Sequence, residues 1–291
     1  MKHIPVRGRV SSVARCFSVI FQIATILLLM LPAANAQITA NVFRRVFMIK
    51  AGKDIGTAFT IDVDGRQYLV TAKHVVASLK GRDSIFLRKG EDWISTTVDV
   101  FRCEDPVDIA VLIPPAQLTV TFVLEPTMSG VQFGQDVFFV GFPYGKIFTD
   151  GRNVNGFYPL PFVKRGVLSA QTIDNGATSI WLDGHNNPGF SGGPIVFRDL
   201  LRNDFVYKVA GIVSGYTPEL TPILRPVDIP ADEDQSMVES WRIVQLPNGH
   251  RVRLEDTEQR VAANSGILRG YSIQHAVDLI RKHPTGPRVT D

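Results

Sequence analysis

The stretch TAFTIDVDGRQYLVTA, residues 57–72, contains two short apolar runs on either side of the dipeptide Asp64-Gly65. Asp-Gly is typical of the tight turn of a β-hairpin, because both residues tolerate backbone conformations that most residues avoid. The β-branched, aromatic and aliphatic residues of the two runs favour strands. The stretch therefore predicts two antiparallel strands, 57–62 and 68–72, joined at this turn.

Short β-type runs of the same kind continue through most of the chain, and glycines separate them. A proline-rich stretch, residues 114–130, interrupts the strand spacing and divides the runs into two sets. We expect an all-β fold of two antiparallel six-stranded β-barrels, residues 37–125 and 126–291, because barrel closure removes exposed strand edges. The other predicted strands are 43–50, 84–88, 94–101, 108–113, 137–140, 162–170, 178–183, 195–198 and 205–213.

The second barrel is expected to carry an insertion, residues 217–265. Its first part, 217–240, is rich in proline and then in acidic residues, which is typical of an exposed loop. Its second part contains two short β-type runs, 241–246 and 251–254, around Pro247-Asn248-Gly249. These runs predict a hairpin built on the loop.

The C-terminal segment has the apolar spacing of an amphipathic helix. Ser272 suits the N-cap of such a helix, and Pro284 would end it. The apolar residues that share one face are Ile273, Ala276, Val277 and Ile280. We therefore expect the second barrel to be followed by a C-terminal helix.

The N-terminus has the composition of an export signal. Basic residues precede the apolar run 16–31, and Ala34-Asn35-Ala36 has the small-x-small pattern of a signal-peptidase site. We expect residues 1–36 to be a cleaved signal peptide in place of a retained anchor, because the apolar run is short for a spanning helix. The mature protein is then secreted or periplasmic, without stable membrane insertion.

Charge and cysteine content limit the partners of the mature chain. Removal of residues 1–36 lowers Lys+Arg from 31 to 31 − 4 = 27, against 28 Asp+Glu, so the net charge becomes 27 − 28 = −1. A nearly neutral chain gives no support for binding to nucleic acids or anionic membranes. Only Cys103 remains, so we expect no intramolecular disulfide and a buried, unreactive thiol.

The segment NPGFSGGP, residues 187–194, places one serine among glycines. A nucleophilic serine must be exposed beside a base, and the oxyanion that forms needs two backbone N–H groups aimed at one point. Gly189 permits a backbone geometry that turns its own N–H and that of Ser191 toward such a point. An ordinary glycine-rich turn between strands is the alternative for this segment alone.

A base and an orienting carboxylate occur beside two strands of the first half. His74 follows the run 68–72, and Asp108 opens the apolar run 108–113. Asp108 can accept the Nδ1 proton of His74, which can then take the hydroxyl proton of Ser191. Each residue alone is commonly an ordinary surface or turn residue, but the order His, Asp, Ser within an exported all-β chain predicts a catalytic triad.

These segments resemble the chymotrypsin-like serine peptidases, and among them the bacterial trypsin-like peptidases related to HtrA/Do. The resemblance covers residues 42–216 and implies two perpendicular β-barrels with the active site in the cleft between them. It also implies that Val213, Ser214 and Gly215 belong to the strand that binds the peptide substrate. Besides the histidine segment, it rests on residues 56–62, 133–145, 163–170 and 183–194.

The sequence departs from this family in two places. Phe190 precedes the serine, where relatives usually carry Asp or Asn, so activation by an ion pair with a newly cleaved N-terminus is not expected. About 75 residues follow Tyr216 and contain the loop, the hairpin and the helix, so no PDZ-like module is expected. The absence of an acidic residue just before Ser191 favours a small or medium apolar residue before the scissile bond.

The sequence thus predicts a serine endopeptidase that cleaves protein or peptide substrates through an acyl-enzyme. We expect no cofactor and no metal ion, because the histidines lack the spacing of metal ligands. Two alternatives remain open. One is a peptide-binding protein whose oxyanion hole is lost because of Phe190, and the other is an esterase that uses the same three residues.

Overall fold

The computed structural model describes residues 38–120, 122–147, 158–201, 206–229 and 242–290. The expected signal peptide, residues 1–36, lies outside these ranges. Within them, no helix has both the length and the apolar character needed to cross a membrane.

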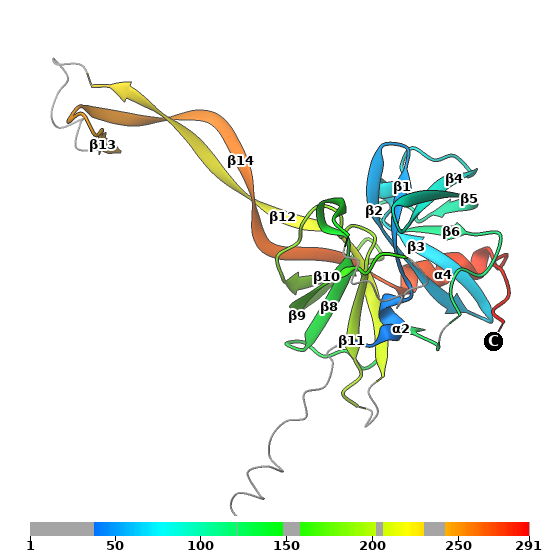
Figure 1. Ribbon diagram of the computed structural model, residues 1–291. Coiled ribbons are helices and arrows are strands. Elements are labelled where there is room, and N and C mark those ends of the chain that lie inside the picture. Colours follow the sequence, from blue (N-terminus) through cyan, green and yellow to red (C-terminus); the bar gives the residue numbers. More distant parts are fainter. Residues whose placement is uncertain (1–37, 121, 148–157, 202–205, 230–241, 291) are drawn as a thin grey trace, which may run out of the picture. The chain divides into compact units, whose positions relative to one another are not determined.

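Residues 46–113 form a closed antiparallel barrel, in which β1 pairs with both β2 and β4 (Figure 1). The predicted hairpin turn is present at Asp64 (φ 50°) and Gly65 (φ 72°), between the paired residues Val63 and Arg66. The strands are β1 (Val46–Ala51), β2 (Asp54–Val63), β3 (Arg66–Thr71), β4 (Arg82–Lys89), β5 (Asp92–Arg102) and β6 (Ala110–Ile113), and the short helices nearby are α2 (Ala40–Phe43) and η1 (Lys73–Val76).

A second set of six antiparallel strands also closes on itself, in the order β8-β9-β10-β14-β12-β11 and back to β8. These strands are β8 (Asp136–Gly141), β9 (Phe162–Asp174), β10 (Ala177–Asp183), β11 (Pro194–Arg198), β12 (Tyr207–Asp228) and β14 (Arg251–Ser272). The remaining elements are β7 (Glu125–Pro126), β13 (Ile243–Gln245), the short helix η2 (Pro143–Gly145) and the C-terminal helix α4 (Gln274–Lys282). The predicted all-β fold of two six-stranded barrels with a C-terminal helix is confirmed.

The outer part of β12 differs from the sequence prediction. Residues 217–228 were expected in a loop, but they continue β12 and pair with residues 252–264 of β14 in a two-stranded ribbon (Figure 1). The prolines of this segment suggested a loop, but an edge strand tolerates proline where the missing N–H would not face the partner strand. The predicted hairpin around residues 247–249 is present, because β13 pairs with residues 251–253.

One hydrophobic cluster joins the two barrels and the C-terminal helix. It includes Phe59 of β2, Val140 of β8 and Ile212 of β12, which are all fully buried. Helix α4 buries Ala276, Val277 and Ile280 in the same cluster, as its apolar spacing predicted. The helix therefore holds the end of the chain against both barrels.

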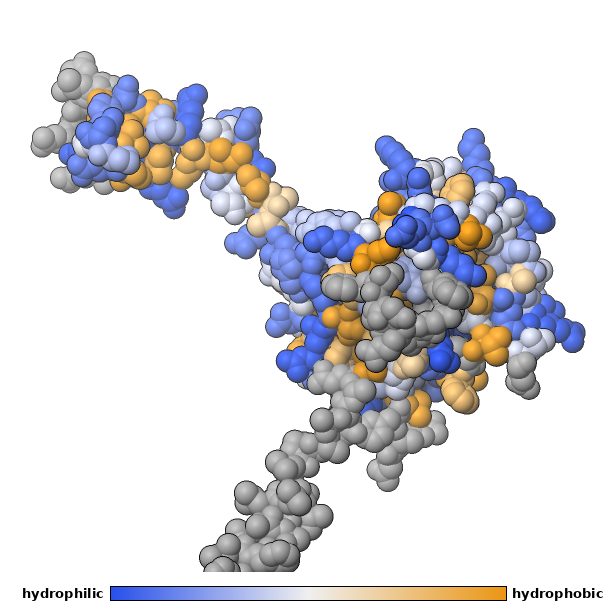
Figure 2. All heavy atoms as spheres, in the orientation of Figure 1, coloured by the Kyte–Doolittle hydropathy of each residue, from blue (hydrophilic) through white to orange (hydrophobic). Residues whose placement is uncertain are grey.

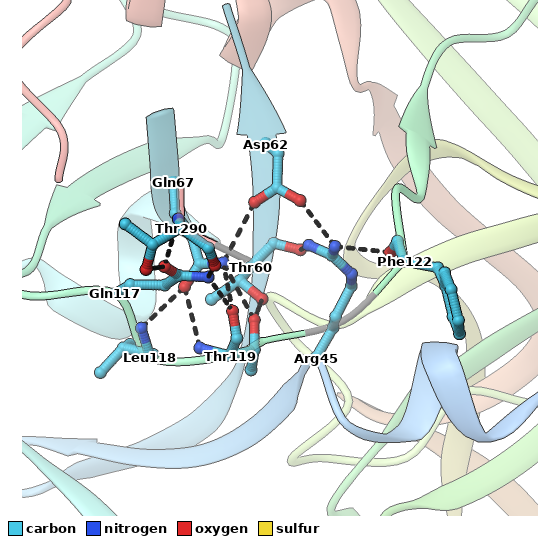
Figure 3. Close-up of polar contacts among 9 residues, drawn as sticks. All are labelled: Arg45, Thr60, Asp62, Gln67, Gln117, Leu118, Thr119, Phe122 and Thr290. Carbon is cyan, nitrogen blue, oxygen red and sulfur yellow. Dashed lines mark hydrogen bonds and ion pairs between the residues drawn. The ribbon is translucent and has the colours of Figure 1, made fainter. Parts of the chain in front are cut away.

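A buried polar network fixes the segment that connects the barrels (Figure 3). The guanidinium group of Arg45, which is 1% exposed, binds the Asp62 carboxylate (2.6 Å) and donates to the Phe122 carbonyl (2.7 Å). The Gln67 side chain accepts from the backbone N–H of Thr119 and donates to its carbonyl, both at 3.0 Å. The ion pair with Asp62 fixes the Arg45 guanidinium that binds the Phe122 carbonyl, and this bond and those of Gln67 hold the connecting segment on the first barrel.

Candidate active site

The pairing of β3 with β6 brings His74 and Asp108 to one end of the first barrel. Thr71 of β3 is opposite Ala110 of β6, and these strands are antiparallel, so residues that follow β3 lie beside residues that precede β6. His74 Nδ1 lies 2.7 Å from Asp108 Oδ2, and the backbone N–H of His74 donates to Asp108 Oδ1 (3.0 Å). Both carboxylate oxygens thus bind the same residue, which leaves His74 Nε2 as the ring nitrogen that can act as a base.

The local charges favour the ionised forms of this pair. The hydrogen bond to Asp108 raises the pKa of His74 above its ordinary value of 6.5, although burial acts in the opposite direction. Burial raises the pKa of the Asp108 carboxyl, but hydrogen bonds from His74 and Ser214 outweigh it and leave that pKa below its ordinary value. Asp108 is therefore a carboxylate at neutral pH and can stabilise an imidazolium ion at His74.

Ser214 of β12 connects this pair to Ser191. Its hydroxyl donates to Asp108 Oδ2 (2.6 Å), and its carbonyl accepts the hydroxyl proton of Ser191 (3.2 Å). Proton transfer from Ser191 to His74 thus requires a rotation of the Ser191 side chain away from this carbonyl. Such contacts are commonly loose in structures without substrate and tighten in the complex. Sequence reasoning placed Ser214 in the substrate strand but gave no sign of its bond to Asp108.

The backbone around Ser191 is held by hydrogen bonds from other segments. Each of the five consecutive carbonyls of residues 187–191 accepts a proton. The donors, in that order, are Phe190 N (3.3 Å), Tyr144 N (2.7 Å), Thr57 Oγ1 (2.6 Å), Gly193 N (2.8 Å) and Thr57 N (2.9 Å). The two N–H groups that flank Phe190, those of Gly189 and Ser191, donate to no acceptor within the described part of the chain.

The directions of these two N–H groups follow from the carbonyls that share their peptide planes. The N–H of Gly189 shares a peptide plane with the Pro188 carbonyl and points the opposite way, and the N–H of Ser191 is related in the same way to the Phe190 carbonyl. Because both carbonyls are bound to other groups, the directions of both N–H groups are fixed. Unpaired, pre-oriented donors beside a serine hydroxyl are the groups that stabilise a tetrahedral oxyanion.

Two glycines make this backbone path possible. Gly189 has φ 102°, and a Cβ atom there would lie 2.2 Å from the Phe142 carbonyl oxygen. Gly192 has φ 85°, and a Cβ atom would lie 2.1 Å from the Thr57 carbonyl oxygen. Since side chains rarely adopt such φ values and these contacts are with backbone atoms, both positions require glycine.

The Phe190 side chain lies in the core of the second barrel. It is 0% exposed and packs edge-on against Phe139, with ring centroids 5.2 Å apart. The ammonium group of Lys164 lies 5.5 Å from the centre of the Phe190 ring. It also donates to the His185 carbonyl (2.7 Å) and to Asn187 Oδ1. Sequence reasoning noticed Phe190 but did not find Lys164, which lies in a strand distant in sequence.

The three residues of the predicted substrate strand lie in different environments. Val213 is fully buried, and its backbone groups bond to Gly192 N (2.8 Å) and Gly193 O (2.9 Å). Ser214 is partly exposed at a bulge in the pairing with β14, and Gly215 beyond it pairs with Arg269. Ser214 is thus the predicted residue whose backbone contacts Ser191, through its carbonyl (3.2 Å from Ser191 Oγ).

Other candidate chemistry is sparse. Across the residues whose positions are described, no three His, Cys, Asp or Glu side chains gather closely enough to hold a metal ion. Cys103 is partly buried, and burial raises the pKa of its thiol to about 11, so it is protonated at neutral pH. A protonated thiol is a poor nucleophile.

Comparisons with known proteins identify similar sequences. A family model described as "Trypsin-like peptidase domain" matches residues 56–200. The magnetosome formation protease MamE of Paramagnetospirillum magneticum is 27% identical over 168 residues, which are 56% of this chain and 21% of that relative. This chain thus spans about a fifth of the length of the curated relative that it matches.

A comparison with solved structures also gave matches. The inactive form of the Rv3671c protease, from M. tuberculosis, is 17% identical with a TM-score of 0.49, over 84% of this chain and 90% of that one. The HtrA-type protease AlgW with a tripeptide is 18% identical with a TM-score of 0.48, over 84% of this chain and 61% of that one.

Proposed function

We propose that this chain, which belongs to the trypsin-like peptidase family, is a serine endopeptidase with Ser191 as nucleophile, His74 as general base and Asp108 as the residue that orients His74. One observation supports this proposal above all others. Ser214 links the Asp108–His74 pair to the hydroxyl of Ser191, and the loop that carries this hydroxyl has two N–H groups, those of Gly189 and Ser191, without an acceptor in the described part of the chain. An ordinary glycine-rich turn needs neither of these features.

The reaction follows from these positions. Ser191 Oγ attacks the carbonyl carbon of a peptide bond while His74 Nε2 takes the hydroxyl proton, and the carbonyl oxygen becomes an oxyanion bound by the two N–H groups. His74 then gives that proton to the departing amine, and the C–N bond breaks to leave an acyl-enzyme. A water molecule, deprotonated by His74, attacks the ester, and Ser191 recovers its proton as the acid product leaves.

Asp108 and Ser214 support the imidazolium ion that exists during both steps. Asp108 is ionised at neutral pH, so the positive charge that forms on His74 has a negative partner 2.7 Å away. The hydroxyl of Ser214 donates to the same carboxylate and keeps it charged. Such fixed charges act without reorganisation at the moment of reaction, which makes them effective in catalysis.

The proposed substrates are proteins or peptides, bound beside Ser214 and Gly215. Backbone pairing with an extended peptide gives affinity with little dependence on sequence. The proposal assigns no cofactor to the reaction, since each proton transfer uses His74. It also includes export: the pattern of residues 1–36 supports a mature chain 37–291 that is secreted or periplasmic.

Digestion of an unfolded protein tests this proposal directly. Purified wild-type protein should cleave reduced casein into peptides, and Ser191→Ala and His74→Ala should abolish cleavage. Ser84→Ala, a change on a distant strand of the first barrel, should leave cleavage unchanged. Equal cleavage by the wild type and Ser191→Ala would contradict the proposal, and binding of casein without cleavage would favour a peptide-binding protein.

A further inference from the structure

Thr57 of β2 connects the first barrel to the loop around Ser191 in the second. Its side chain is fully buried. The hydroxyl donates to the Gly189 carbonyl (2.6 Å) and accepts from the backbone N–H of Phe142 (3.2 Å). Its backbone N–H donates to the Ser191 carbonyl (2.9 Å). One residue of the first barrel thus binds three backbone groups of the second.

The hydroxyl of Thr57 binds the loop at Gly189, where the loop's own side chains restrain the backbone least. Gly189 must be glycine, as its φ of 102° and its close contact with Phe142 show, and glycine allows the peptide planes on either side to rotate. Tyr144 N–H holds the plane before Gly189 through the Pro188 carbonyl. The Thr57 hydroxyl holds the plane after it, through the Gly189 carbonyl. Both planes are therefore fixed by groups outside the loop.

The residue after Gly189 contributes no polar anchor from its side chain. Phe190 is fully buried among apolar residues, so its side chain secures the loop by packing. Packing restrains the position of the ring but sets the direction of the neighbouring carbonyl only weakly, because apolar contacts are not directional. A hydrogen bond is directional, so the Thr57 hydroxyl supplies the orientation that the Phe190 side chain does not.

We propose that the Thr57 hydroxyl is a positioning group for catalysis: from the opposite barrel it fixes the Gly189–Phe190 peptide, which joins the residues of the two proposed oxyanion donors, so that the N–H groups of Gly189 and Ser191 keep their relative orientation. This inference rests on the proposed peptidase activity. It makes the oxyanion hole dependent on the docking of the two barrels, since the donor and the loop it orients belong to different barrels.

Thr57→Val tests the inference, because valine keeps the shape of threonine and removes the hydroxyl. We expect kcat for a peptide substrate to fall about 10-fold to 100-fold, since a buried carbonyl loses its donor, while KM changes less than about threefold. Thr57→Ser keeps both hydrogen bonds and should retain kcat within about threefold of wild type. The pH midpoint of kcat/KM should not move in either variant, because His74 and Asp108 are untouched.

Thr60→Val is the matched control. Thr60 lies on the same strand, is fully buried, and shares a hydrogen bond with Thr119 (2.9 Å), so this change also removes a buried hydroxyl. Its kcat should stay within about threefold of wild type, because the Thr60 hydroxyl bonds to Thr119 and not to the loop around Ser191. Equal kcat values for Thr57→Val and Thr60→Val would overturn the inference.

Amide exchange separates this inference from the proposed function. A folded wild-type protein without peptidase activity would refute the peptidase proposal, and the loop can then be followed in protein labelled with ¹⁵N-glycine. The Gly193 N–H donates to the Phe190 carbonyl within the loop (2.8 Å). Faster exchange of this amide in Thr57→Val than in Thr57→Ser and Thr60→Val supports the positioning role, and equal exchange in all three overturns it.

Discussion

The loop around Ser191 and the outer ribbon of β12 and β14 both belong to the second barrel, but different contacts hold them in place. In the loop, the carbonyls of residues 188, 189 and 191 accept protons from residues 144 and 57, and Phe190 is fully buried. In the ribbon, the two strands pair with each other, and Leu220 and Val261 are 61% and 52% exposed. Figure 2 shows the apolar surface that this leaves along the ribbon.

The two regions should therefore differ in how well they tolerate substitutions. Side chains and backbone groups of the loop contact several distant segments at once, so a small change there has no room to relax. Pairing within the ribbon depends mainly on register between two strands, so single changes on its exposed faces should be tolerated. The chain offers matched residues in the two regions, and they allow this comparison to be tested.

The largest contrast should come from two Asp–His pairs. Asp108→Asn should lower kcat/KM by about 10⁴-fold, because His74 loses the carboxylate that fixes its tautomer and stabilises its charge. Asp228 of the ribbon also binds a histidine, His250 Nε2 (2.8 Å), but Asp228→Asn should leave kcat/KM within about twofold. Steady-state kinetics with one peptide measures both, and a similar loss in the two variants would break the comparison.

The pH profile sharpens that prediction. A histidine must be deprotonated to act as a base, so kcat/KM of the wild type should rise with pH through a midpoint above 6.5, because Asp108 raises the pKa of His74. In Asp108→Asn the residual activity should have a lower midpoint. A midpoint that stays in place in this variant would show that Asp108 does not set the pKa of the base.

Substitution of one apolar residue in each region should also change the free energy of unfolding by very different amounts. Phe190→Ala should lower the free energy of unfolding by about 3–5 kcal/mol, because a fully buried aromatic ring leaves a cavity in the second barrel. Leu220→Ala in the ribbon should change it by less than about 0.5 kcal/mol. Urea titration followed by tryptophan fluorescence gives both values. A loss of several kcal/mol for Leu220→Ala would mean that the ribbon is packed against a surface.

Two glycines provide the next contrast. Gly189→Ala should lower kcat/KM by about 10²-fold to 10³-fold, because the new methyl group displaces the peptide that carries an oxyanion donor. Gly266 of β14 also has a left-handed backbone (φ 80°), but nothing lies within 4 Å of a Cβ atom there. Gly266→Ala bears similar backbone strain and should retain kcat/KM within about threefold. Equal effects would indicate that backbone strain, and not the crowding by Phe142, is responsible.

Removal of the ribbon should have the smallest effect on the reactive serine. Pro218 and Asn264 are paired, so residues 219–263 can be replaced by an Asn-Gly turn between them. The pairing of residues 211–216 with 268–272, which closes the second barrel, is retained. Labelling of Ser191 by a fluorophosphonate should keep its rate within about twofold. A large loss in a folded variant would place the ribbon in the active site.

The same contrast explains what the sequence could predict. The turn at Asp64-Gly65 and the buried face of α4 were predicted because each depends on residues close together in the chain. The ribbon was missed because three prolines, Pro218, Pro222 and Pro226, favour a loop locally, whereas their pairing with residues 254–264 of β14 favours a strand. Register between distant strands has no local signal.

The candidate site divides in the same way. His74, Asp108, Gly189 and Ser191 were found from their flanking residues and order, and their catalytic roles stay predictions. The roles of Thr57 and Lys164 were not predicted, because each depends on how strands from separate parts of the chain approach one loop. Thr57 stood within the stretch that indicated the first hairpin, where nothing distinguishes it from a strand residue.

Covalent labelling of purified residues 37–291 with a fluorophosphonate tests the central claim most directly, because it requires no knowledge of the substrate. We predict a single adduct, located on Ser191 by peptide mass spectrometry. It should be absent in Ser191→Ala and form at least about 100-fold more slowly in His74→Ala, which lacks the general base. A folded wild-type protein that takes no label, or takes it on another residue, would contradict the assignment of Ser191 as an activated nucleophile.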